Sequence, residues 1–136
     1  MDVTRIAAAK KYDAAKHWDM TALRLQGLEA SPTKKVTVGL SYFLPGGGAE
    51  KSASPLERVY VVVDGEVCVT IDGKDTTLGP LDSCHIPPGE ERAIVNKTNK
   101  VATMLVVMPA RETPDIGRIA STRCSLPWTF FPTPRP

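Results

Sequence analysis

Alternation of apolar and polar residues along the middle of the chain is the feature that most constrains its fold. From Val36 to Leu44, valine, leucine and tyrosine occupy every second position, which is typical of a β-strand with one buried face. The pairs Asp64-Gly65 and Asp72-Gly73 indicate tight hairpin turns, because Asp and Gly tolerate the positive φ that such turns need. We therefore expect an antiparallel sheet rather than a parallel sheet with crossover helices.

Further segments of strand length follow at hairpin spacing. They are Val59–Val63, Val67–Ile71, Asp75–Leu78, Cys84–Ile86, Arg92–Val95 and Val101–Met108. Several short strands separated by turns predict an all-β fold, an antiparallel double-stranded β-helix or jelly-roll barrel. The chain of 136 residues has the length of one domain.

Both ends of the chain differ from this strand-rich middle. We expect residues 1–35 to form an N-terminal arm, residues 36–109 the barrel core and residues 110–136 a C-terminal arm. The C-terminal segment is rich in proline and aromatic residues, which predicts an extended arm that packs on the barrel or on a partner subunit. Such an apolar arm favours a homodimer, because an exposed aromatic patch would otherwise be a liability.

Charge and cysteine content exclude several classes of function. The 17 basic and 15 acidic residues give a net charge of +2 and lack the dense basic stripe of a nucleic-acid-binding protein. Cys68, Cys84 and Cys124 form neither a disulfide framework nor a CxxC zinc pattern. No apolar run has the length of a signal peptide or of a membrane span, which takes about 20 residues. We expect a cytoplasmic protein that binds neither nucleic acid nor membrane.

Two motifs in the strand-rich middle of the chain resemble those of the cupin family. The first cupin motif is G, five residues, H-x-H, three or four residues, E, six residues, G; Gly46 and Gly65 fit its ends at the family spacing. The second motif is G, five residues, P-x-G, two residues, H, three residues, N; Pro87, Gly89 and Asn96 fit it. The resemblance covers roughly residues 36–108 and implies a cupin barrel, commonly found as a homodimer.

The family's metal-binding places are occupied by residues that do not suit a metal. In cupins, two histidines and a glutamate of the first motif and the histidine of the second hold a divalent metal. The four places here are Ser52, Ser54, Arg58 and Arg92. Serine hydroxyls are poor ligands, and a guanidinium is cationic and has no lone pair to donate. We therefore expect no metal and no cofactor. The opening glycine of the second motif is also replaced, by Leu81.

Arg58 and Arg92 are the main candidates for a binding site. If Arg58 faces the barrel interior, Tyr60 and Val62 share that face, and Arg92 points into the same cavity from the opposite sheet. Two buried guanidiniums need an anion, since an unpaired buried charge costs several kcal/mol.

Two sources of that anion are open. A small organic carboxylate matches the planar fork of arginine, and Ser52, Ser54 and Tyr60 would add hydroxyl donors. Alternatively, a glutamate from the same two motifs folds inward and fills the barrel. The candidates are Glu50, Glu57, Glu90 and Glu91.

Three functions follow from these alternatives. The first is a metal-free cupin that binds a small anionic ligand, as a sensor or accessory protein. The second is a metal-independent lyase, isomerase or cyclase acting on a small organic acid, with Tyr60 or His85 as the candidate proton carrier. The third is a structural protein with a filled barrel. His85 has an ordinary strand role as its alternative, and His17 is expected to be exposed or to pack within the arm.

Overall fold

The computed structural model of the chain describes residues 1–110. A 3₁₀ turn and nine strands follow one another in this part. They are η1 Ile6–Ala8, β1 Lys10–Tyr12, β2 His17–Gln26, β3 Val36–Ser52, β4 Arg58–Asp64, β5 Val67–Ile71, β6 Lys74–Leu78, β7 Ser83–Ile86, β8 Arg92–Val95 and β9 Ala102–Pro109. The one helical segment within residues 1–110, η1, has 3 residues, so no helix there could cross a membrane.

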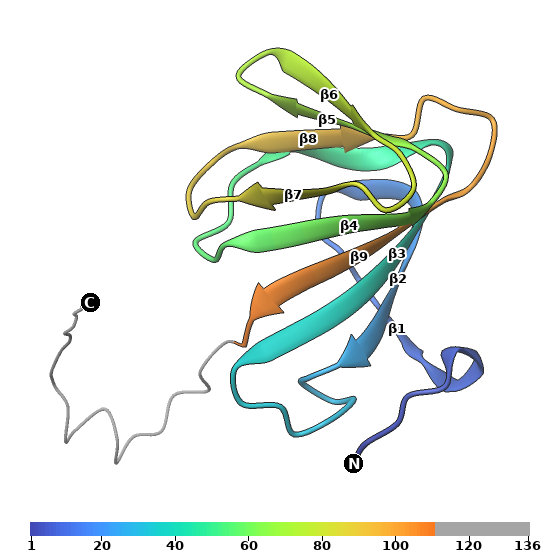
Figure 1. The fold of residues 1–136 in the computed structure, drawn as a ribbon, viewed down its shortest axis with the longest axis vertical. Helices are drawn as coiled ribbons and strands as arrows, with labels where there is room; N and C mark the ends of the chain where they lie inside the picture. Colours follow the sequence, from blue (N-terminus) through green and yellow to red (C-terminus); the bar gives the residue numbers. More distant parts are fainter. Residues whose placement is uncertain (111–136) are drawn as a thin grey trace, which may run out of the picture.

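The strands form one antiparallel sheet that curls into a nearly closed barrel (Figure 1). The order along the sheet is β6-β5-β8-β3-β9-β4-β7, and β2 and β1 extend it from β3. The hairpin β5–β6 lies at one end of this path and β7 at the other. The all-β antiparallel barrel predicted from the alternation and the hairpin turns is confirmed.

Strand β3 extends beyond the alternating segment Val36–Leu44, because it continues through the glycine run Gly46-Gly47-Gly48 to Ser52. Its first half pairs with β2 and β9, and its second half pairs with β8. A Cβ atom at Gly47 or Gly48 would overlap the carbonyl oxygen of Asp19 or Ile94, respectively. Only glycine admits so close an approach of two backbones. The run therefore lets β3 bend from one side of the barrel to the other.

The N-terminal arm is part of the sheet. Strand β2 pairs with β3 from His17 opposite Ala49 to Gln26 opposite Val38, and β1 pairs with β2. Backbone hydrogen bonds thus fix a segment that the sequence predicted only as an arm. The predicted C-terminal arm lies outside the described residues, apart from Ala110, and so does Cys124.

The apolar core lies inside the barrel and draws on the seven strands β3 to β9. Its buried members are Phe43, Ala49, Tyr60, Val62, Val67, Val69, Leu78, Ile86, Ile94, Ala102 and Met104. Tyr60 is the one member of this set with a polar end that binds a charged group, because its hydroxyl accepts a hydrogen bond from Arg92. The core therefore adjoins a polar region inside the same barrel.

The turn before β7 holds a leucine in a backbone conformation that favours glycine. Leu81 has a φ of 69° and is 80% exposed, and its N–H donates to the carbonyl of Val62 at 2.7 Å. It stands at the place where the family motif has glycine. A left-handed backbone costs about 1–2 kcal/mol for a residue with a Cβ, and an exposed leucine gains little from burial.

We predict that Leu81→Gly stabilises the protein by about 0.5–1 kcal/mol, because relief of the left-handed strain exceeds the entropy that glycine loses on folding. Urea denaturation of the wild type and the variant measures the difference. The matched control is Leu81→Ala, which keeps the Cβ and should change the free energy of unfolding little. A Leu81→Gly protein less stable than the wild type would mean that the leucine side chain makes a stabilising contact.

Candidate functional site

The inward face of β4 carries an arginine at its start. Arg58, Tyr60 and Val62 alternate along β4 and are 5%, 2% and 0% exposed, because side chains two residues apart share one face of a strand. Arg92 begins β8 opposite Ser52 of β3 and is also 5% exposed. Two guanidinium groups are thus buried in one barrel.

Arg92 is held by three hydrogen bonds. Its Nε donates to the Tyr60 hydroxyl at 2.8 Å, and its Nη1 donates to the Glu50 carbonyl and to Ser52 Oγ, each at 3.1 Å. All three acceptors are neutral groups. The position of Arg92 is therefore fixed, but its positive charge is not neutralised by them.

Arg58 is bound much more loosely. Its Nη2 donates to the carbonyl of Glu90 over 3.4 Å, and its buried Nε has no hydrogen-bond partner among the described residues. A buried donor without a partner costs free energy, so such groups are rare in native proteins. Burial lowers the pKa of Arg58 below its usual value; the neighbouring Tyr60 opposes this and the charge of Arg92 adds to it. Arg58 Nε is therefore a buried donor without an acceptor among the described residues.

None of the four glutamates of the two motifs places its carboxylate against Arg58 or Arg92 within residues 1–110. Glu57 binds His85, with 2.8 Å between Oε1 and Nε2, and Glu91 lies 3.6 Å from Lys51. Glu50 and Glu90 contribute only backbone carbonyls to the arginines. Within the described part of the chain, neither Arg58 nor Arg92 forms an ion pair.

A cavity of about 170 Å³ adjoins both arginines. Its polar lining consists of Tyr12, His17, Ser41, Ser54, Arg58, Tyr60 and Arg92. Its apolar lining consists of Ala14, Phe43, Ile94, Met104, Val106 and Met108. The described lining contains basic and neutral side chains and no carboxylate, so the cavity is suited to a negatively charged guest with some apolar surface.

The structure brings together most of the residues that the sequence singled out. Tyr60 and Ser54 line the cavity with the arginines, and Ser52 adjoins it by accepting from Arg92. Ser54 Oγ also accepts a hydrogen bond from the Leu56 N–H at 3.1 Å, which fixes its rotamer in the loop before β4. Whether these residues bind a ligand stays a prediction.

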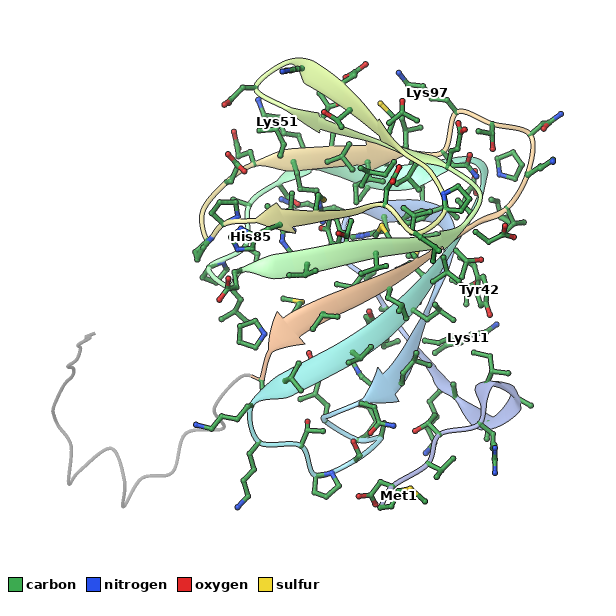
Figure 2. The ribbon with its side chains drawn as sticks, viewed as in Figure 1. Met1, Lys11, Tyr42, Lys51, His85 and Lys97 are labelled. Atoms are coloured by element: carbon green, nitrogen blue, oxygen red, sulfur yellow. The ribbon has the colours of Figure 1, made fainter. Side chains whose placement is uncertain are left out.

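His85 lies outside the lining of the arginine cavity. Its neighbour Ile86 pairs with Arg58 across β4 and β7 and faces the core, so His85 points to the other side of the strand. Figure 2 shows it on β7, and its side chain is half-exposed and bound to Glu57. It lines a separate hollow of about 440 Å³ beside β5 and β6. His85 is therefore not among the residues that line the arginine cavity.

Two residues of the N-terminal arm, Tyr12 and His17, line the cavity without having been predicted there. His17 was expected to be exposed or to pack within the arm, but β2 carries it to the arginines. Its ring lies with Nδ1 2.6 Å from the carbonyl oxygen of Ala15. Burial lowers the pKa of His17 and the charges of Arg92 and Arg58 add to this, against the opposing effect of the Ala15 contact. No local pattern marks the residue, because only the long-range pairing of β2 with β3 places it.

The residues at the family's metal places do not fit a divalent metal. Arg58 and Arg92 both stand within the barrel as cations, and the oxygen of Ser52 already accepts a hydrogen bond from Arg92. Within residues 1–110 no three His, Cys, Asp or Glu side chains come together as a possible metal-binding group. A dication at this point would meet two positive charges and hydroxyl ligands of low affinity.

Comparisons with known proteins agree with the fold. Residues 39–108 match the family model described as a cupin domain. A protein of Mycobacterium tuberculosis (strain ATCC 25618 / H37Rv) named beta-D-galactosidase Rv1717 is 47% identical over 108 residues, which cover 79% of this chain and 93% of that protein.

Solved structures share the architecture at lower identity. The polyketide cyclase RemF from Streptomyces resistomycificus has a TM-score of 0.74 and 19% identity, covering 84% of this chain and 82% of its own. A sugar phosphate isomerase of the cupin superfamily from Silicibacter pomeroyi has a TM-score of 0.66 and 21% identity, covering 81% of this chain and 75% of its own. These two likenesses concern the fold alone.

The contrast between the two arginines generates a stability prediction. We predict that Arg58→Met raises the free energy of unfolding of the ligand-free protein by about 1 kcal/mol, because it removes an uncompensated buried charge and keeps the apolar volume. Arg92→Met should lower it by about 1–2 kcal/mol, since the Tyr60 hydroxyl and the Glu50 carbonyl lose their donor.

Urea denaturation of both variants in buffer free of organic acids measures these changes. Lys51→Met, which removes an exposed positive charge, is the control for net charge. If Arg58→Met proves the less stable of the two arginine variants, Arg58 has an internal anionic partner and the geometry described above is wrong.

Proposed function

This chain belongs to the cupin family, and from that premise we propose that its barrel binds a small organic carboxylate between Arg58 and Arg92 without a metal ion. The protein then acts as a binding module, a sensor or an accessory protein. The observation that carries the proposal is the buried Arg58 Nε without a partner, beside a cavity that contains a second arginine.

The chemistry of the cavity favours a carboxylate. A carboxylate can accept two parallel hydrogen bonds from one guanidinium, and Arg58 lines the cavity with one long hydrogen bond among the described residues, 3.4 Å from Nη2 to the Glu90 carbonyl. Its charge would offset the repulsion between the two arginines, which is strong where water is excluded. The hydroxyls of Ser54 and Tyr60 add neutral hydrogen-bonding groups at the same wall.

The volume of the cavity limits the size of the ligand. Pockets for drug-sized ligands measure about 300–1,000 Å³. The cavity is smaller than that range, so the proposed ligand is a short organic acid.

We also propose that the protein is a cytoplasmic homodimer with no nucleic-acid or membrane partner. Large apolar side chains that are exposed in the single chain support a second subunit. Examples are Trp18, Leu44 and Val63. Sedimentation velocity of the purified full chain tests this part of the proposal.

A thermal-shift screen tests the binding proposal. The panel contains short mono- and dicarboxylates, with inorganic phosphate and chloride at equal ionic strength as anion controls. We predict that at least one carboxylate raises the melting temperature of the wild type by several degrees when it is present at about 100 times its Kd. The shift should vanish in Arg58→Ala and Arg92→Ala and persist in Lys51→Ala.

The proposal fails if no acid stabilises the wild type, or if Arg58→Ala responds as strongly as the wild type does. The bound acid is also followed by NMR during long incubation. Recovery of unchanged acid supports a binding module, whereas its conversion points to the metal-independent lyase, isomerase or cyclase.

A second candidate function is hydrolysis of a β-galactoside, which the name of the relative of 47% identity favours. Most glycosidases use two carboxylates at the scissile bond, and the described lining of the arginine cavity has none. The larger hollow has one carboxylate, Asp72, in its described lining, and its His85 binds Glu57, which lies outside that lining. We therefore assign this candidate function to the hollow beside β5 and β6 that His85 lines.

Release of p-nitrophenol from p-nitrophenyl β-D-galactopyranoside tests that candidate. It predicts turnover that is lost in Asp72→Asn and Glu57→Gln and retained in Arg58→Ala. Absence of turnover in the wild type removes the candidate, and sensitivity to Arg58→Ala would move the reaction to the arginine cavity.

A further inference from the structure

His17 places a hydrogen-bond acceptor in the arginine cavity. The residue lies at the start of β2 and lines the cavity with Arg58 from β4 and Arg92 from β8. Guanidinium groups only donate hydrogen bonds. The imidazole is therefore a different kind of group from the two arginines, and it comes from a part of the chain outside both family motifs.

The backbone contact of the ring identifies which nitrogen is available. Nδ1 lies 2.6 Å from the carbonyl oxygen of Ala15, and a carbonyl oxygen can only accept, so Nδ1 carries the proton. In the neutral ring Nε2 is then an acceptor with a free lone pair.

The charges around His17 favour this neutral form. The titratable groups that face it across the cavity are Arg58 and Tyr60 on β4, Arg92 on β8 and Tyr12 on β1. Asp13 and Asp19 line the neighbouring hollow that His17 also borders, but no carboxylate stands in the described lining of the arginine cavity. Burial, with the charges of the two arginines, lowers the pKa of His17 against the opposing Ala15 contact, which favours the neutral ring.

The backbone holds His17 in a fixed place. The Glu50 N–H donates to the Lys16 carbonyl at 2.9 Å, and Trp18 Nε1 donates to the Gly46 carbonyl at 2.8 Å. Lys16 and Asp19, on either side, have φ values of 60° and 48°, which non-glycine residues adopt only when their surroundings impose them. The segment is thus pinned against β3 at the cavity.

We propose that the ligand is a hydroxy acid, whose carboxylate binds Arg58 and Arg92 and whose hydroxyl donates a hydrogen bond to His17 Nε2. This inference rests on the proposed function and adds the substrate class. A plain carboxylate contacts the arginines alone and leaves the imidazole acceptor of the half-buried His17 to solvent. A hydroxyl on the same small molecule supplies that donor, and the cavity has room for both groups.

Pairs of acids that differ by one hydroxyl test the inference. Isothermal titration compares lactate with propionate and malate with succinate at pH 7. The wild type should bind the hydroxy member about two- to tenfold more tightly, the range that one neutral hydrogen bond provides. His17→Phe should bind both members of each pair equally. His17→Gln, whose amide oxygen accepts, should keep part of the preference.

The outcomes separate this inference from the proposed function. If each pair binds equally to the wild type while binding still requires Arg58, the hydroxy-acid inference is overturned and the carboxylate site stands. The same holds if His17→Phe keeps the full preference. If no acid binds the wild type, both proposals fail. Should His17→Phe not fold, the comparison of wild type with His17→Gln decides.

Discussion

Two guanidinium groups share the interior of one small barrel, and no carboxylate of residues 1–110 neutralises them. The barrel meets this constraint unequally. Arg92 is built into the wall by three neutral acceptors, whereas Arg58 keeps a buried donor without a partner. Burying the Arg58 charge without a partner costs free energy in the free protein. Binding of an anion would remove this cost, so the same charge favours binding. The positive charge of the cavity lining and the lack of a suitable metal-ligand set within residues 1–110 both follow from this pair of arginines.

The fold positions the pair through two strands. On β4, the period of two sets Arg58 and Tyr60 on the inner face, and the Tyr60 hydroxyl then links β4 to Arg92 on β8. On β3, the glycine run lets a single strand bend and pair with β2, β9 and β8. The same bend brings the start of β2 to the cavity, so one backbone device supports both the barrel and the site.

Much of this could be predicted from local sequence. Alternation and Asp-Gly turns define the strands, and parity on β4 gives the inward face of Arg58. Residues whose place depends on long-range strand pairing could not be predicted from local sequence. His17 reaches the cavity only because β2 pairs with β3, and His85 misses it because Ile86 takes the inward place on β7. The continuation of β3 through the glycine run could not be predicted either, because glycines are typical both of a turn and of a close backbone approach. The C-terminal arm, beyond residue 110, stays a prediction.

The most direct test of the account is the ¹H–¹⁵N spectrum of the arginine Nε–Hε groups during titration with malate or succinate. Arg58→Met and Arg92→Met assign the two buried signals. The account predicts that the Arg58 Hε signal moves downfield as the acid binds, since it gains its first acceptor, while the Arg92 signal changes little because it already donates to Tyr60. An Arg58 signal that is downfield in the free protein and unmoved at saturating acid would contradict it, because the arginine would then already have an internal anion.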